Sequence, residues 1–253
     1  MSINRKILWK CTTAGRIHVL EETLYSFINQ DNLEDSEMII VNDYPLQTLH
    51  YDHPNVKIFN IKEPFKTIGE KDNFCIEQSD AEIICVTDDD DTYLNNHNNN
   101  IRKYFVEGTT IGHWFGAYYN YPDITKLMGI GNSGMVYSRE AWLKVGKHEA
   151  INEGGDTVFS NKLHELGNWI EMIPPLEEVS AFYRWSLPNN GGVYHQSGLG
   201  SFVEGRPNAI QRHAQHIEQL RRRGLIPTGD IELKPHWNQD YSKLLKDFIN
   251  NKK

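Results

Sequence analysis

The sequence predicts an α/β fold in which a mainly parallel sheet is flanked by helices. Apolar runs rich in β-branched residues recur through the first half of the chain, as buried strands do. Segments with apolar residues at helical spacing separate these runs, and one run ends in four consecutive aspartates. Strands that alternate with helices form mainly parallel sheets, whose ligands gather beyond the carboxyl ends of the strands. The fold class therefore also predicts where a site should lie.

The first half of the chain supplies most of the expected sheet. Strands are predicted at residues 7–11, 38–41, 56–61 and 82–87. The first strand is followed by a helix over 17–28, in which apolar residues recur every three or four positions. A second helix is predicted over 70–78.

The second half is less regular, and its elements are predicted from shorter patterns. A glycine-rich turn leads into a strand near Tyr137, and the polar, glycine-rich residues 186–205 are expected to form a mobile loop. A further strand is expected at 181–185, and helices at 139–145, after 153–156, at 208–223 and at 240–249. We therefore expect one sheet domain over residues 1–205 and a C-terminal helical extension over 206–253.

The composition of the 253-residue chain is that of an ordinary globular protein, with 39% hydrophobic and 24% charged residues. No apolar run is long enough to span a membrane, and the start of the chain lacks a signal-peptide core. Three cysteines in or beside apolar segments predict reduced thiols in a cytoplasmic protein. A net charge of −8 argues against a broad nucleic-acid surface, and residues 221–223, three arginines, are more simply a solvated helix end.

The four carboxylates of Asp88–Asp91 follow the fourth strand directly. Neighbouring negative charges repel one another unless a cation or solvent relieves them. In an extended segment Asp88 and Asp90 would face the same way, which suits a hard divalent ion such as Mg²⁺ held by carboxylates and substrate phosphates. A solvated acidic turn and a calcium loop are the alternatives, although Leu94 interrupts the spacing that a calcium loop requires.

Polar residues follow three of the predicted strands. Thr12 and Thr13 end the first, Asp43 follows the second and the acidic cluster follows the fourth. Because the carboxyl ends of parallel strands share one edge of the sheet, we expect these residues to converge although they are far apart in sequence.

Over residues 5–185 the order of these motifs resembles that of the GT-A glycosyltransferases, specifically the large inverting group called family 2. The aspartate run is similar to the Asp-x-Asp-Asp metal motif of that family, and Asp43 ends a strand as the base-contacting aspartate of the family does. The sequence departs from the family pattern at the opening turn, which lacks the usual Pro and Asn, and at Asp72 and Gly155, where Arg and Glu are common. The remaining similar segments are 12–16, 24–30, 69–73 and 155–156.

The resemblance implies a nucleoside diphosphate sugar donor, most often a uridine one. Asp43 would contact the base, Thr12, Thr13 and Arg16 would line the same pocket, and Lys71 and Asn73 belong to a donor-binding segment. Asp89 would face the ribose or the sugar.

The resemblance also implies a metal and a base. Asp90, helped by Asp88, would hold Mn²⁺ or Mg²⁺ against the diphosphate, where the ion stabilises the charge that develops as the sugar leaves. Asp156 would take the proton from an acceptor hydroxyl, and one displacement would invert the anomeric carbon. The acceptor class stays open: a glycan, a lipid-linked sugar, a protein or a modified nucleic acid all offer hydroxyl groups.

Each assignment has a structural alternative. Asp43 could be a turn residue before Pro45, Asp156 could be a helix N-cap, and Lys71 and Asn73 could be exposed helix positions. Two other functions also fit: a nucleotidyltransferase with the same acidic site, or a non-catalytic sugar- or nucleotide-binding relic of the fold.

Two further expectations concern the second half of the chain. Residues 189–205 are expected to act as a lid, within which His195 could complete the coordination of the metal. Five aromatic residues could either stack on an acceptor sugar or pack in the core: Trp114, Tyr118, Tyr119, Tyr121 and Trp185.

Overall fold

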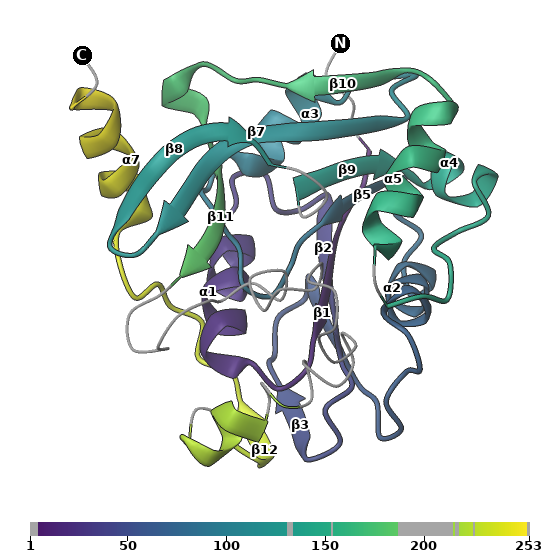
Figure 1. The fold of residues 1–253 in the computed structure, drawn as a ribbon, viewed down its shortest axis with the longest axis vertical. Coiled ribbons are helices and arrows are strands. Elements are labelled where there is room, and N and C mark those ends of the chain that lie inside the picture. Colours follow the sequence, from purple (N-terminus) through teal and green to yellow (C-terminus); the bar gives the residue numbers. More distant parts are fainter. Residues whose placement is uncertain are drawn as a thin grey trace, which may run out of the picture.

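A ten-stranded sheet forms the centre of the computed structural model (Figure 1), which describes residues 5–130, 134–152, 154–186, 215, 218–224 and 226–251. The hydrogen-bonded order is β4-β2-β1-β5-β9-β7-β11-β6, with β8 and β10 also paired to β7. These strands are β1 (Ile7–Thr13), β2 (Ser36–Asn42), β4 (Val56–Asn60), β5 (Ile83–Val86), β6 (Thr92–Tyr93), β7 (Ile111–Asn120), β8 (Asp123–Gly129), β9 (Met135–Ser138), β10 (Trp169–Met172) and β11 (Ala181–Ser186).

The half of the sheet built from the start of the chain is parallel, as predicted. β4, β2, β1 and β5 are parallel neighbours, with Thr13 of β1 opposite Asn42 of β2. β9 is antiparallel to β5 and β7, whereas β10 and β11 are parallel to β7. The carboxyl ends of β1, β2 and β5 consequently lie at one edge.

The two faces of the sheet are covered by different helices. Residues at odd positions of β1, such as Trp9, pack on one face with α1 (Ile17–Ile28) and α3 (His97–Tyr104). Leu8 points to the other face, where it packs with α2 (Ile68–Glu77), α4 (Arg139–Lys144) and α5 (Gly155–Glu165). This alternation along a strand buried on both faces explains why the strand is apolar nearly throughout.

The middle of the chain holds most of the elements that the sequence did not predict, among them α3, β7, β8 and β10; the short strands β3 (Gln47–His50), β6 and β12 (Gly229–Glu232) were not predicted either. β7 carries glycines at positions 112 and 116, which are unusual inside a strand. Neighbouring atoms come too close to both glycines to leave room for a side chain. A Cβ on Gly112 would lie 2.7 Å from the Met172 side chain, and one on Gly116 would lie 2.6 Å from the Ala181 carbonyl oxygen. Tertiary packing, rather than local propensity, therefore specifies this strand.

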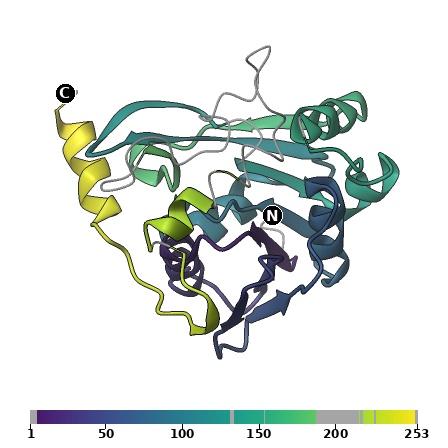
Figure 2. The ribbon, with the colours of Figure 1, turned by 60° about the horizontal axis from the view of Figure 1, so that its bottom comes forward.

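The described C-terminal residues run along the α1 side of the molecule and end beside β8 (Figure 2). β12 (Gly229–Glu232) pairs in parallel with β3 (Gln47–His50), and residues 218–222 of the predicted helix are helical. Tyr241 and Leu245 of α7 (Tyr241–Asn250) pack against Ala117 of β7 and Phe182 of β11. Within the described residues, every helix is too short or too polar to cross a lipid bilayer.

Candidate active site

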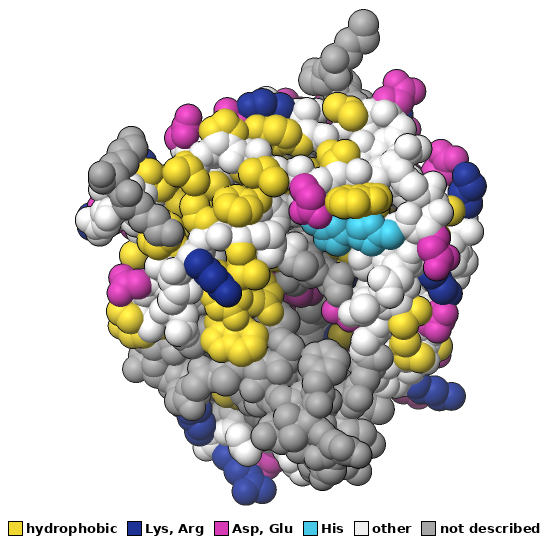
Figure 3. All heavy atoms as spheres, turned by 45° about the horizontal axis from the view of Figure 1, so that its top comes forward, with side chains coloured by type: hydrophobic (Ala, Val, Ile, Leu, Met, Phe, Trp, Pro, Cys, Tyr) yellow, Lys and Arg dark blue, Asp and Glu magenta, His cyan; other side chains and the backbone are white. Residues whose placement is uncertain are grey.

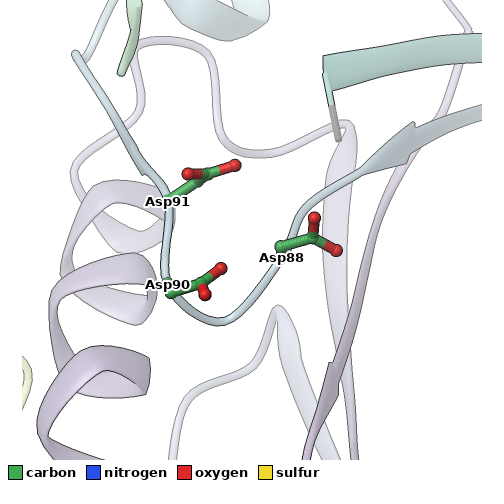
Figure 4. Close-up of side chains that lie close together, drawn as sticks. All are labelled: Asp88, Asp90 and Asp91. Atoms are coloured by element: carbon green, nitrogen blue, oxygen red, sulfur yellow. The ribbon is translucent and has the colours of Figure 1, made fainter. Parts of the chain in front are cut away.

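The acidic residues form a turn after β5 rather than an extended segment. The Asp91 amide donates to the Asp88 carbonyl oxygen (3.3 Å), which closes the turn. Ligand oxygens of Asp88, Asp90 and Asp91 all lie within 4.8 Å of one another (Figure 4). Asp88 and Asp90 converge, as predicted. The predicted cause, an extended segment, was wrong, because a turn brings these two side chains together and places Asp91 beside them.

Asp89 points away from this group and is 1% exposed. Its carboxylate accepts a hydrogen bond from Thr13 Oγ1 (2.6 Å) and forms an ion pair with Arg16. Arg16 also donates to Asp90 Oδ2 (2.9 Å), so a single guanidinium bridges two neighbouring aspartates. Asp89 and Arg16 thereby fix the turn to the end of β1, and a contact of Asp89 with a ribose or sugar remains a prediction.

Two further side chains hold the backbone of the turn. Thr23 of α1 donates through Oγ1 to the Asp91 carbonyl oxygen (2.6 Å). Arg184 of β11 is completely buried and donates through Nε to the Asp90 carbonyl oxygen, while its backbone amide donates to Asp91 Oδ1 (3.0 Å). The carboxylates are therefore presented by a rigid support from α1 and β11.

The charges of the described residues leave the acidic cluster only partly compensated. Burial and the neighbouring Asp90 charge raise the pKa of Asp88 to about 7. Burial, followed by the charges of Asp90 and Asp88, also raises the pKa of Asp91 well above its usual value. A divalent cation would reverse both effects, and three carboxylates at this spacing are the oxygen donors that Mg²⁺ and Mn²⁺ prefer.

Beneath Asp88 lies a buried ion pair between Lys10 of β1 and Asp72 of α2, with Nζ and Oδ1 2.6 Å apart. Burial alone would lower the pKa of Lys10, but the carboxylates of Asp72 and Asp88 outweigh it and raise that pKa to about 12. Lys10 is therefore a fixed positive charge at the floor of the site. Thr12 Oγ1 lies 3.5 Å from the same Asp72 oxygen.

The ends of β1 and β2 are joined by Lys71. Its Nζ donates to the Thr13 carbonyl oxygen (2.6 Å) and to Asp43 Oδ1 (2.5 Å). Lys71 is 6% exposed, so the alternative of an exposed helix position was wrong. The other oxygen of Asp43 accepts from the Phe65 amide (3.3 Å). The strand ends, the acidic turn and Lys71 thus form one continuous polar network.

The nitrogen and the oxygen of the Asn73 side-chain amide both form hydrogen bonds within the fold. Its Nδ2 donates to the His148 carbonyl oxygen (2.8 Å), and its Oδ1 accepts from the His148 amide (2.9 Å) and from Trp142 Nε1 (3.2 Å). These contacts anchor residues 147–152, the segment that leads to α5, on α2. A direct contact of Asn73 with a donor remains a prediction.

Asp156 lies in the first turn of α5 and is exposed. Its Oδ1 accepts from the Thr157 amide (2.7 Å). The N-cap of α5 is Gly154, in the left-handed conformation at φ 68°, so the alternative of Asp156 as the cap was wrong. An exposed carboxylate at a helix N-terminus is available to a substrate.

The five aromatic residues divide between the core and the surface. Trp114 and Tyr119 are completely buried, whereas Tyr121 is 47% exposed. Tyr118 stacks on Trp185, with centroids 5.9 Å apart, and Lys126 lies over the Tyr118 ring. His195 and the expected lid over 189–205 lie outside the described residues.

Three residues at this site were missed in the sequence, although each had a signal. Asp91 is the last member of the acidic run, but we assigned no role to it. Lys10 and Arg184 each interrupt an apolar strand. A charge in such a run is rarely buried without a partner, so each could have been read as one half of a buried ion pair.

Comparison with known protein families identifies the class. The model of the family described as glycosyl transferase family 2 matches residues 12–167, more than half of the chain. This protein therefore belongs to glycosyl transferase family 2, and it is a glycosyltransferase by family. A search of curated protein sequences finds no match.

Solved structures establish the GT-A fold. The S. aureus TarS fragment 1–349 superimposes with a TM-score of 0.54 at 16% identity, over 71% of this chain and 60% of that fragment. The same fragment in complex with UDP-GlcNAc gives 0.55 at 14% identity, over 86% and 72%. The mannosyltransferase PcManGT from Pyrobaculum calidifontis, in complex with GDP-Man and Mn²⁺, gives 0.56 at 14% identity, over 90% and 67%. This chain thus spans about three fifths of the first TarS fragment.

Proposed function

We propose that this protein transfers a sugar from a nucleoside diphosphate sugar, with uridine as the base, to an acceptor hydroxyl group. The observation that carries the proposal is the convergence of Asp88, Asp90 and Asp91 at the sheet edge, in a chain of glycosyl transferase family 2. Family membership favours this over a nucleotidyltransferase, and the intact acidic cluster favours it over a non-catalytic relic. The three buried thiols of Cys11, Cys75 and Cys85 support our placing it in the cytoplasm.

The nucleoside is proposed to lie across the ends of β1 and β2. Asp43 would accept a hydrogen bond from the base, held in position by Lys71. Thr12, Thr13 and Arg16 would form the wall between the base and the acidic turn, since Thr13 and Arg16 both contact Asp89. Lys71 would contribute mainly by fixing both strand ends, because its ammonium already has two oxygen partners.

Asp88, Asp90 and Asp91 would hold Mn²⁺ or Mg²⁺, which supplies positive charge to the diphosphate leaving group. The chain contributes the position of these carboxylates through Thr23, Arg184 and Arg16. Lys10 adds fixed positive charge from below. Because these groups would already be in position, they would not need to reorganise when negative charge develops on the leaving group.

Asp156 is proposed as the general base. It is exposed at the N-terminus of α5, and Asn73 and Asn152 tie the segment before it to α2: Asn152 Oδ1 accepts from the Ile68 amide (3.0 Å). A base held in this way can take the proton of an acceptor hydroxyl while that oxygen attacks the anomeric carbon, and a single such displacement inverts the configuration.

The acceptor is proposed to contact the aromatic surface of Tyr118, Tyr183 and Trp185. The Tyr118 and Tyr183 rings are 5.2 Å apart, and all three are partly exposed. Figure 3 shows a broad hydrophobic area on one face of the molecule, with a basic side chain lying over it. Aromatic rings offer apolar faces for a sugar, which is why we favour a carbohydrate-bearing acceptor.

A thermal-shift screen tests the donor. Uridine and guanosine diphosphate sugars are compared with and without Mn²⁺, because a ligand that binds the folded state raises its melting temperature. We expect a uridine diphosphate sugar and Mn²⁺ together to stabilise more than either alone, and release of UDP when an acceptor is added. Failure of every nucleotide sugar to stabilise the protein would contradict the proposal, and release of pyrophosphate instead would favour a nucleotidyltransferase.

A further inference from the structure

Two histidines outside the acidic site meet at the surface of the sheet. His113 lies on β7 and His164 in the last turn of α5, and their Nε2 atoms are 3.1 Å apart. The rings are nearly parallel, at 9°, and both are partly exposed. Figure 3 shows histidine at the surface, gathered with hydrophobic and acidic side chains.

We propose that His113 and His164 chelate a divalent transition-metal ion of the Zn²⁺ class. Two nitrogens bound at about 2.0–2.1 Å to one tetrahedral ion are roughly 3.3 Å apart. The observed 3.1 Å therefore needs only a small opening of the pair. Imidazole nitrogens suit Zn²⁺, Cu²⁺ and Ni²⁺, whereas the carboxylates of the acidic turn suit Mg²⁺ and Mn²⁺. The two sites would thus select different ions.

The register of the sheet supplies a third ligand. Glu171 of β10 is opposite His113 in the parallel pairing of β10 with β7, so both side chains point to the same face. Trp169, two residues earlier, points to this face too, and its ring lies against His164 at 5.0 Å. Among the described residues, Asp88, Asp90 and Asp91 are the only three such side chains whose ligand atoms already lie within 4.8 Å. Glu171 is exposed and would reach the ion by rotating its side chain.

The proton balance of the pair is simple. In the metal-free protein one Nε2–H donates to the lone pair of the other Nε2. When an ion binds, that proton moves to Nδ1 of the same ring, so both Nε2 lone pairs face the ion and no net proton is released. His164 is in the last turn of α5, where the helix dipole favours a cation.

A bound ion would join the end of α5 to β7 and β10. α5 already packs on this face through Leu163, which is completely buried with Ile111. The chelate would therefore stabilise the helix that carries Asp156 at its other end. This inference does not depend on the proposed sugar transfer.

Calorimetric titration of the full chain with Zn²⁺, in the presence of excess Mg²⁺ to occupy the acidic turn, tests the site. We expect one Zn²⁺ per chain. Removing a residue that only supports a metal ligand lowers affinity by about 10–100-fold. His113→Gln and His164→Gln each remove a ligand, so we expect each to lower the Zn²⁺ affinity by more than this. His53→Gln is the matched control, because His53 is a partly exposed histidine that stacks on Tyr51 elsewhere. Zn²⁺ binding that is absent in the wild type, or unchanged in both variants, would overturn the proposal.

Two further measurements do not depend on the folding of the histidine variants. X-ray absorption at the zinc edge of the wild-type protein should show imidazole scattering from two ligands, and an oxygen-only shell would exclude the pair. Glu171→Gln should weaken Zn²⁺ binding less than either histidine variant does. An unchanged affinity would remove Glu171 from the ligand set.

Discussion

Neighbouring carboxylates repel one another, and the residues around the acidic turn compensate them unequally. Arg16 pairs with Asp89 and Asp90. Among the described residues, Asp88 and Asp91 have no arginine paired with their carboxylates as Asp89 and Asp90 do, and the pKa of each is raised, first by burial and then by the neighbouring aspartates. Geometry then separates Asp89 from the other three: Asp89 is held inside the fold by Thr13 and Arg16, whereas the ligand oxygens of Asp88, Asp90 and Asp91 lie together, where the proposed cation would bind.

Asp90→Asn should remove Mn²⁺-dependent transfer while the fold stays intact. The substitution takes one oxygen ligand away, and loss of several kcal/mol of charge stabilisation corresponds to a fall in rate of roughly 10²-fold or more. Relief of repulsion and loss of the Arg16 contact oppose each other, so the melting temperature should change little. UDP release at increasing Mn²⁺ concentration measures transfer, and thermal unfolding measures the melting temperature. The exposed Asp52→Asn is the control, and near-normal turnover of Asp90→Asn would show that the metal assignment is wrong.

Asp156→Asn should abolish transfer but leave donor binding unchanged. An amide has nearly the size of the carboxylate but cannot accept the proton, and general-base losses are typically about 10²–10⁴-fold. Single-turnover transfer and calorimetry with the donor separate the two steps. Glu165→Gln, an exposed carboxylate at the other end of α5, controls for a change in helix charge. A loss of only a few-fold would restrict Asp156 to a structural role.

At the scale of the elements, α2 is the support for both sides of the site. Its Lys71 joins the ends of β1 and β2, and its Asn73 anchors the segment that leads to Asp156. The approach at the start of α2 is so close that a Cβ on Gly69 would collide with the Glu149 carbonyl oxygen. A shift of α2 would therefore move the ends of β1 and β2 and the segment before Asp156 together.

His148 makes this support sensitive to acid. Its ring stacks on Phe159 and its Nε2 lies 3.1 Å from the Tyr137 hydroxyl, and burial lowers its pKa from 6.5 to about 4. Because the folded state disfavours the charged form, its contribution to stability is present above about pH 6.5 and is lost as the pH falls toward 4. Linkage predicts a loss of about 2 kcal/mol in the free energy of unfolding between pH 7.5 and pH 5.

Urea unfolding at both pH values tests this prediction. His148→Gln should show a smaller loss of stability on acidification than the wild type. The buried His97, whose pKa burial lowers to about 3, adds to the acid sensitivity of both proteins equally. Parallel pH profiles for wild type and His148→Gln would contradict the assignment.

The same elements show how far the sequence could predict the structure. β1, β2, β4 and β5 were predictable because each is a short apolar run, and the parallel rule then placed Thr13, Asp43 and the acidic turn together. β7 could not be predicted, since its glycines fit neighbours that are far away in sequence. The role of Lys71 was equally hidden, because its burial depends on how α2 packs against the strand ends.

At the scale of the whole molecule, the C-terminal helix is connected to the acidic turn through a buried network. Arg184 pairs with Glu22 of α1 (2.7 Å), and both side chains are completely buried. The hydroxyl of Tyr241, in α7, donates to Glu22 Oε2 (2.9 Å) and accepts from Arg184 Nη1 (3.1 Å). Because Arg184 also holds the Asp90 carbonyl oxygen and Asp91 Oδ1, α7 supports the site from a distance.

This connection predicts that two substitutions in α7 will both lower stability, but that only one of them will change the metal dependence of the activity. Tyr241→Phe removes the hydroxyl from two charged partners, which should cost about 1.5–3 kcal/mol of stability. Leu245→Ala deletes buried apolar atoms in the same helix and should cost about 2–5 kcal/mol. Only Tyr241→Phe should also raise the Mn²⁺ concentration needed for half-maximal activity, by roughly fivefold if Arg184 loses about 1 kcal/mol of support for the turn. Urea unfolding and metal titration of the two variants measure these effects. An equal change of metal dependence in both would mean that α7 acts through global stability alone, and no change in either would separate α7 from the site.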